Sequence, residues 1–278
     1  MIIEILKTII LGIVEGITEW VPISSTGHML LVDEFMQLNV TPEFKEMFLY
    51  VIQLGAILAV VILFWDKMWP FNFKDKSKPV IIKETFSTWF KVVVACIPGT
   101  VLTLLFDDYI EAHLQTPTVI AIALIFYGIL FIVIENWNKK RTPTTLELQD
   151  ITYKTAFIIG LFQMLSIIPG TSRSGSTIIG ALTIGVSRVA AAEFTFFLAV
   201  PVMIGISFIK IIKFVMSGIA MTGAEIVILA VGCIVAFAVS VLVIKFLMSY
   251  IKRKDFKVFG WYRIVLGIVV LLYYLVIK

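Results

Sequence analysis

Six apolar stretches, each close to twenty residues long, restrict this chain to folds that a membrane allows. They lie at about 46–65, 89–106, 118–137, 191–212, 225–247 and 258–277. A helix of about 20 apolar residues spans the hydrocarbon core of a bilayer. Because 60% of the residues are hydrophobic and only 15% are charged, unlike a soluble domain, we expect an all-α polytopic membrane protein with six transmembrane helices.

Two short polar segments interrupt this apolar chain. The first, Glu15–His28, reads E-G-I-T-E-W-V-P-I-S-S-T-G-H, and the second, Pro169–Thr177, reads P-G-T-S-R-S-G-S-T. Polar and charged groups inside a membrane are costly and usually functional. Irregular backbone persists at membrane depth only where protein or a wet cavity surrounds it. We therefore predict a re-entrant helical hairpin around each segment, at 1–37 and 155–186.

The two polar segments also look like copies of one another. An offset that places Gly12 on Gly160 preserves further pairs. These are Glu15 and Gln163, Ser24 and Ser172, Thr26 and Ser174, and Gly27 and Gly175. We divide the chain into a first repeat at 1–141, a linker at 142–154 and a second repeat at 155–278, within one integrated membrane domain. A hairpin and three spans make an odd number of crossings, so the two copies are predicted to form an inverted-topology repeat.

Loop charges predict how the protein lies in the membrane. Thirteen of the 23 Lys and Arg residues fall at 66–87, 138–154 and 249–257, whereas 107–117 has none. By the positive-inside rule the basic connections are cytoplasmic. Both termini and the mouth of the first hairpin then lie on the outer face, and the second hairpin enters from the cytoplasm. No stripe of basic residues interleaved with aromatic residues is present, so nucleic acid is not an expected partner.

Glu15 and Glu19 are four residues apart, so a helix places both carboxylates on one face. Two carboxylates crowded at low dielectric repel each other, so either one is protonated or a cation lies between them. An all-oxygen pair favours Mg²⁺ or Ca²⁺ as the divalent cation. The alternative is that both carboxylates face the aqueous mouth of the cavity and bind no metal.

His28 follows two candidate nucleophiles, Ser24 and Ser25. A histidine can take a proton from a serine or from water and return it to a leaving group. The alternative is that His28 only forms a hydrogen bond with a neighbouring helix. Gln53, a polar side chain in an apolar stretch, either reaches the cavity or forms a hydrogen bond between helices. Arg263, in the aromatic-rich last span, is interpreted as an interfacial anchor.

Arg173 stands between two serines at a glycine-bracketed turn. Its guanidinium can bind two phosphate oxygens at once, which a lysine cannot do. The backbone N–H groups of G-T-S-R-S-G, before a helix expected to start near Ser176, can bind the same anion. The alternative is that Arg173 only pairs with a glutamate of the first segment.

These motifs resemble the bacterial undecaprenyl-diphosphate phosphatase family of the bacitracin-resistance type. The resemblance rests on the two polar segments and on V-I-Q-L-G, in the family's order, and covers essentially the whole chain. It implies hydrolysis of undecaprenyl diphosphate to undecaprenyl phosphate and phosphate at the outer face of the bacterial plasma membrane, which recycles the lipid carrier of cell-wall synthesis. It also implies dependence on a divalent cation, bacitracin resistance, and six spans with two re-entrant hairpins.

Matched position by position, the resemblance implies the site residues. Those with a functional role are Glu15, Glu19, Ser25, His28 and Arg173, and also Ser24, Ser172 and Thr177. The substrate-binding set that we predict is Arg173, Ser172, Ser174, Thr177, Gly170, Ser24, Thr26 and Gln53, with Glu15 and Glu19 as metal ligands. Either Ser25 attacks the terminal phosphorus with His28 as its base, or His28 and a carboxylate activate water. The sequence leaves both routes open, and it also leaves a homodimer open.

Two other function classes fit parts of the pattern. A lipid-phosphate or anion transporter, or a flippase, also uses inverted repeats with broken helices. It would bind a prenyl diphosphate without releasing phosphate. An intramembrane serine protease needs a buried Ser–His pair but has no use for Arg173 and two glutamates.

Overall fold

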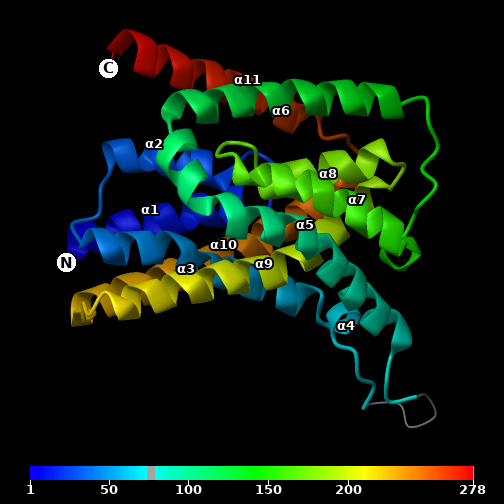
Figure 1. The fold of residues 1–278 in the computed structure, drawn as a ribbon, viewed down its shortest axis with the longest axis horizontal. Helices are drawn as coiled ribbons and strands as arrows, with labels where there is room; N and C mark the ends of the chain where they lie inside the picture. The colour runs from blue at the N-terminus through cyan, green and yellow to red at the C-terminus, as the bar shows by residue number, and fades with distance from the viewer. Residues whose placement is uncertain (74–78, 278) are drawn as a thin grey trace.

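The computed structural model describes residues 1–73 and 79–277, and for 107–112 and 277 it describes the backbone alone. Its α-helices in chain order are α1 Ile2–Thr18, α2 Ser25–Phe35, α3 Pro42–Leu63, α4 Trp65–Met68, α5 Lys83–Leu114, α6 Pro117–Asn138, α7 Tyr153–Met164, α8 Arg173–Thr183, α9 Arg188–Met216, α10 Gly223–Ile251 and α11 Lys257–Leu272 (Figure 1). Short 3₁₀ helices lie at Leu148–Asp150 and Leu165–Ile167, and a π-helical turn follows α11 at Tyr273–Ile277.

Six helices among the described residues are long and apolar enough to cross a membrane. They are Pro42–Leu63, Lys83–Phe106, Pro117–Asn138, Arg188–Met216, Gly223–Ile251 and Lys257–Val276. These coincide with the six predicted stretches, which confirms the all-α fold of a multi-pass membrane protein. One connection differs, because α5 continues as a helix to Leu114 through most of 107–117. The acidic side chains expected there, Asp107, Asp108 and Glu111, lie outside the described ones.

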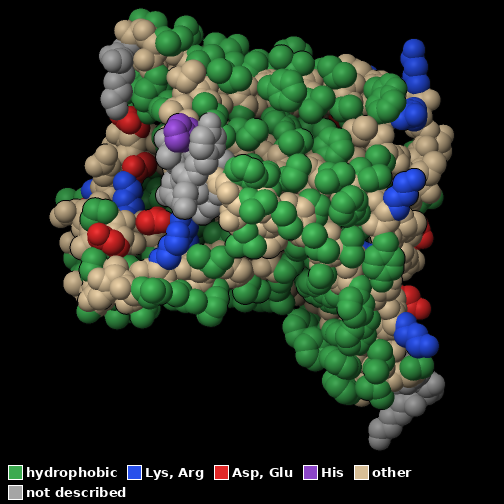
Figure 2. Space-filling model, in the orientation of Figure 1, with side chains coloured by type: hydrophobic (Ala, Val, Ile, Leu, Met, Phe, Trp, Pro, Cys, Tyr) green, Lys and Arg blue, Asp and Glu red, His purple; other side chains and the backbone are tan. Residues whose placement is uncertain are grey.

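The molecular surface is that of a protein surrounded by lipid. Figure 2 shows a broad apolar face, with charged side chains gathered toward the two ends of the molecule. Leu104, Leu242 and Phe208 lie within the candidate spans and are 78%, 69% and 62% exposed. Water contact with so much apolar surface is unfavourable at about 25 cal/mol per Å², whereas lipid contact is not.

The two predicted hairpins each contain a pair of packed helices. The first, expected at 1–37, contains α1 and α2, and the second, expected at 155–186, contains α7 and α8. Pro22 lies in the turn between α1 and α2, where its ring is incompatible with continuation of α1. In Figure 1 the two hairpins extend from opposite ends of the molecule toward its middle, and both chain termini lie at the same end.

Helices of one half of the chain pack against helices of the other half. α1 packs against α10, α7 against α5, α3 against α9, and α6 against α11. Glycines allow several of the contacts between helices. A Cβ added at Gly55 of α3 would lie 2.2 Å from the carbonyl oxygen of Cys233 in α10, and one at Gly160 of α7 would lie 2.4 Å from that of Ala95 in α5. The backbones of α3 and α10 therefore touch only because residue 55 has no side chain.

We predict that Gly55→Ala lowers the free energy of unfolding by about 1–3 kcal/mol, since the new methyl group forces α3 and α10 apart. The matched control is Gly205→Ala in α9, where nothing lies within 4 Å of the added Cβ. Thermal unfolding of both variants in the same detergent measures the difference. Equal melting temperatures would contradict the close α3–α10 contact.

Candidate functional site

The turns of the two hairpins share an unusual backbone conformation. Ser24 and Ser172 have φ angles of 76° and 73°, and they are the positive-φ residues other than glycine in the described chain. Each serine also caps the helix that follows it: Ser24 Oγ accepts from Gly27 N at 3.3 Å, and Ser172 Oγ accepts from Gly175 N at 3.1 Å. Such backbone conformations cost about 1–3 kcal/mol and concentrate at functional sites. The segments that look like copies in sequence thus have matching local structures.

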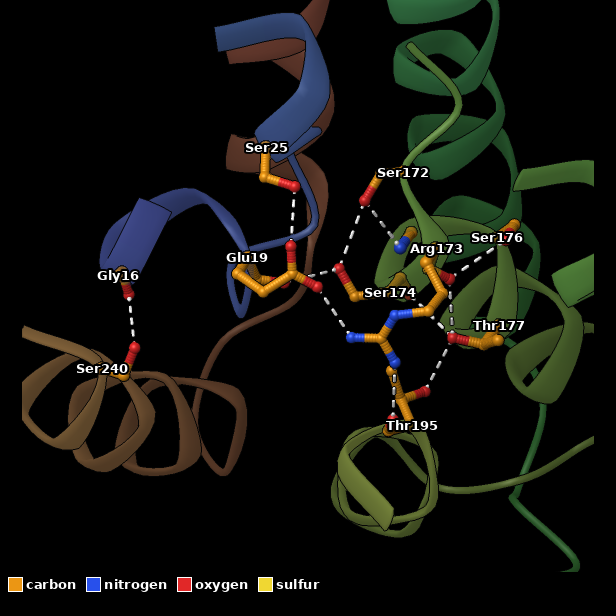
Figure 3. A network of polar contacts seen from close by, with 11 residues as sticks. Gly16, Glu19, Ser25, Ser172, Arg173, Ser174, Ser176, Thr177, Thr195 and Ser240 are labelled. Atoms are coloured by element: carbon orange, nitrogen blue, oxygen red, sulfur yellow. Dashed lines mark hydrogen bonds and ion pairs between the residues drawn. The ribbon is translucent and has the colours of Figure 1, made fainter. Parts of the chain in front are cut away.

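One ion pair joins the two turns (Figure 3). Arg173 Nη2 donates to Glu19 Oε1 at 2.9 Å, and Arg173 Nη1 donates to the backbone oxygen of Thr195 at 3.2 Å. Ser174 Oγ adds a hydrogen bond to the backbone oxygen of Glu19 at 3.2 Å. Because both charged side chains are largely buried, removing one partner would leave an uncompensated charge, at a cost of about 3–5 kcal/mol. The sequence left open whether Arg173 pairs with a glutamate of the first polar segment. In the structure it pairs with Glu19.

Ser25 contacts the same glutamate. At the start of α2 its hydroxyl donates to Glu19 Oε2 at 2.7 Å. One oxygen of Glu19 thus faces the guanidinium of Arg173, while the other faces the hydroxyl of Ser25. A carboxylate in this position can take the serine proton as the serine oxygen attacks an electrophile.

His28 has both ring nitrogens occupied. Nδ1 lies 2.7 Å from the backbone oxygen of Ser24, and Nε2 lies 2.7 Å from the hydroxyl of Tyr262 in α11. A carbonyl oxygen only accepts, so Nδ1 carries a proton, and Nε2 of the neutral ring accepts from Tyr262. His28 therefore forms the interhelical hydrogen bond that the sequence left open. Its action as the base for Ser25 stays a prediction and requires Nε2 to leave Tyr262.

Glu15 is buried next to Glu19. The two side chains are 1% and 6% exposed, so neither carboxylate faces an open aqueous mouth. Oε1 of Glu15 has no hydrogen-bond partner among the described residues, an arrangement that is unfavourable unless a proton or a cation binds there. Among the described residues, no group of three or more His, Cys, Asp or Glu side chains is arranged so that it could hold a metal ion. A cation at this pair fits if water or substrate completes its ligands, as is usual for Mg²⁺.

The other predicted residues fall into two groups. Thr177 supports the arginine, because its hydroxyl donates to the backbone oxygen of Arg173 at 3.0 Å and contacts Thr195 Oγ1 at 2.9 Å. Thr26 is exposed, and Gln53 is half-buried in α3 without a hydrogen bond to any described residue. The structure therefore brings Thr177 into the network but not Thr26 or Gln53.

The helix after the second turn starts earlier than expected. α8 begins at Arg173 rather than near Ser176, with Ser172 as its N-cap. The first-turn N–H groups of a helix carry partial positive charge and attract anions. The guanidinium of Arg173 and these N–H groups therefore belong to the same helix end. Gly170 precedes it with φ +89°, where an added Cβ would lie 2.5 Å from the backbone oxygen of Ile120.

Arg263 reaches the site from α11, although the sequence predicted that it lies at the membrane interface. Its side chain is completely buried, and Nη1 donates to the backbone oxygen of Pro22 at 3.1 Å. Nη2 donates to the backbone oxygens of Gly170 and Thr171, at 2.8 Å each. The interpretation of Arg263 as an interfacial anchor is therefore wrong. The available signal was the cost of an arginine within an apolar span, which by itself indicates a function.

Known proteins with similar sequences cover almost the entire chain. The family model described as "Bacitracin resistance protein BacA" matches residues 8–269. A curated protein of Enterococcus faecalis named "Undecaprenyl-diphosphatase" is 72% identical over 270 residues, which are 97% of this chain and 97% of that protein. A protein of the same name from Lachnoclostridium phytofermentans is 60% identical over 276 residues, 99% of each chain.

Proposed function

The chain belongs to the bacitracin resistance protein BacA family, and from this premise we propose that it hydrolyses undecaprenyl diphosphate to undecaprenyl phosphate and inorganic phosphate. It is then a phosphoric anhydride hydrolase that recycles the lipid carrier of cell-wall synthesis and contributes to bacitracin resistance. A transporter is not favoured, because relatives that match this chain along its length carry the name of a hydrolase.

The observation that carries this proposal is a continuous polar chain from Ser25 through Glu19 to Arg173, with contacts of 2.7 Å and 2.9 Å. Phosphoryl transfer needs an oxygen nucleophile and positive charge beside the oxygens of the transferred group. The hydroxyl of Ser25 supplies the first. The guanidinium of Arg173 and the first-turn N–H groups of α8 supply the second.

The reaction then has two stages. Ser25 Oγ attacks the terminal phosphorus while Glu19 takes the hydroxyl proton, and the bond from that phosphorus to the bridging oxygen breaks, so undecaprenyl phosphate leaves. Glu19 passes this proton to the departing lipid phosphate and becomes a carboxylate again. Glu19 or His28 then takes a proton from water, whose oxygen attacks the phosphoserine. The bond from phosphorus to Ser25 Oγ breaks, the proton returns to Oγ, and inorganic phosphate leaves. In the one-stage alternative, His28 and a carboxylate activate water, which attacks the terminal phosphorus directly. Arg173 holds the phosphate oxygens in both routes.

The divalent cation is a further part of the proposal. Glu15, with its unpartnered oxygen, and Glu19 beside it would hold Mg²⁺ or Ca²⁺. Once bound, the ion would neutralise charge on the diphosphate oxygens.

The arrangement in the membrane is likewise proposed. We infer an inverted-topology repeat with two re-entrant hairpins, and an active-site mouth and both termini on the outer face. Three observations support it: the matching φ angles of Ser24 and Ser172, the termini at one end of the molecule in Figure 1, and the concentration of Lys and Arg at 66–87, 138–154 and 249–257. The apolar surface contacts membrane lipid, and a homodimer stays a prediction.

We predict that Arg173→Glu lowers phosphate release from a prenyl diphosphate by at least about 10³-fold, because it removes the guanidinium that holds the transferred phosphate. Purified protein in detergent and a colorimetric phosphate assay measure this. The control is Arg253→Glu, the same charge reversal at an exposed residue between α10 and α11. Turnover by Arg173→Glu within tenfold of the parent rate would remove Arg173 from the site. Absence of phosphate release from the parent protein would refute the hydrolase itself.

Ser25→Ala separates the two routes. If Ser25 is the nucleophile, as its contact with Glu19 supports, we expect kcat to fall by at least about 10³-fold. Acid quenching of the parent enzyme during turnover should then give phosphoserine at Ser25 by mass spectrometry. Ser217→Ala, at the distant end of α9, serves as the control. Full activity in Ser25→Ala would instead establish direct attack by water.

Removal of divalent cations with a chelator should abolish phosphate release, and added Mg²⁺ or Ca²⁺ should restore it. In Glu15→Gln we expect half-maximal activity to need a cation concentration about tenfold higher, since one charged ligand is lost. Glu43→Gln, an exposed position at the start of α3, is the control. An enzyme that keeps full activity after chelation would contradict the metal proposal.

A further inference from the structure

α11 contributes two neighbouring residues to the site, in addition to those of the two hairpins. Tyr262 contacts His28 of the first hairpin, while Arg263 contacts the backbone of both turns. Neither residue belongs to the two polar segments. α11 therefore contacts a candidate catalytic residue and both turns at once.

Arg263 links the turns without the help of a carboxylate. The carbonyl it contacts in the first turn, at Pro22, lies between Glu19 and Ser25 in the chain. The two it contacts in the second turn, at Gly170 and Thr171, immediately precede Ser172 and Arg173. A guanidinium has donors in a rigid planar fork, which suits several acceptors in fixed directions. Arg263 thus sets the spacing between the first turn, which carries Ser25, and the second turn, which carries Arg173.

The hydrogen bonds of Arg263 and the Glu19–Arg173 ion pair both link the two turns, but they depend differently on charge. In the proposed reaction Glu19 gains a proton and Arg173 binds phosphate, so the Glu19–Arg173 ion pair weakens during turnover. The acceptors of Arg263 are backbone carbonyls, whose charge does not change. The spacing of the turns can therefore persist while the ion pair is exchanged for substrate contacts.

Tyr262 fixes the position of the His28 ring, as Arg263 fixes the spacing of the turns. The Tyr262 and His28 rings stack with centroids 5.6 Å apart and an interplanar angle of 4°. The backbone oxygen of Ser24 binds the Nδ1 side of His28, and the hydroxyl of Tyr262 binds the Nε2 side, so the imidazole is held at both ends. Because Tyr262 is 45% exposed, its hydroxyl can leave Nε2 without rearranging the core.

We propose that Tyr262 and Arg263 are positioning residues for the diphosphate hydrolysis on which this inference rests. Arg263 keeps the two turns at a fixed spacing throughout the reaction. Tyr262 holds the ring of His28 with Nδ1 protonated and Nε2 unprotonated until a substrate or water proton replaces the tyrosine hydroxyl.

The test of Tyr262 reads the histidine directly. The chain has two histidines, so His113→Gln leaves His28 as the sole histidine signal. In that background, ¹⁵N-histidine NMR in lipid nanodiscs should show a protonated Nδ1 and a hydrogen-bonded, unprotonated Nε2. Tyr262→Phe should move the Nε2 resonance to the position of a nitrogen without a donor, while Tyr273→Phe should not. A protonated Nε2 in the parent, or an Nε2 resonance unmoved by Tyr262→Phe, would overturn this role. The spectrum reports on Tyr262 even if the protein hydrolyses no diphosphate.

The test of Arg263 is kinetic. Arg263→Lys keeps the charge but replaces the planar fork by an ammonium, so we expect kcat to fall about a hundredfold with KM little changed, as for a small misplacement of reacting groups. The control Arg253→Lys should keep the parent kcat. Unchanged kcat in Arg263→Lys would refute the positioning role. An Arg263→Lys protein that does not fold would also overturn it, because Arg263 would then be a purely structural residue.

Discussion

The contact between Glu19 and Arg173 is the interaction on which the rest of the site depends. A buried carboxylate and a buried guanidinium are each unfavourable alone, and each becomes tolerable by pairing with the other. They come from different halves of the chain, 154 positions apart. Each of these two buried charges is therefore paired by a residue from the other half of the chain.

Backbone geometry around this pair explains why serine and glycine recur in both turns. Ser24 and Ser172 adopt positive φ angles and cap the helices that follow, which directs Ser25 and Arg173 to the first turns of α2 and α8. Arg263 then bridges the same turns through neutral carbonyls. The site thus combines one link whose charge changes in the proposed reaction with another whose acceptors stay neutral. This combination suits a site that must exchange an ion pair for a phosphate and recover it.

Much of the fold could be predicted from the sequence because membrane helices follow from local composition. Each of the six spans is recognisable from its own residues, and the two polar segments stand out against them. The exact partners within the site could not be predicted in this way. Whether Ser25 faces Glu19 or His28, or Arg263 points inward, depends on contacts between segments far apart in sequence. The length of α5 was missed for a related reason, since a polar end of a helix resembles a loop in composition.

In the proposed reaction both turns hold the terminal phosphate of one substrate. The most direct measurement is an experimental structure of the protein in lipid with a non-hydrolysable, methylene-bridged prenyl diphosphonate. We expect the terminal phosphonate to lie within hydrogen-bond distance of both the Arg173 guanidinium and Ser25 Oγ. A phosphonate that contacts only one turn, or binds away from both, would contradict the account.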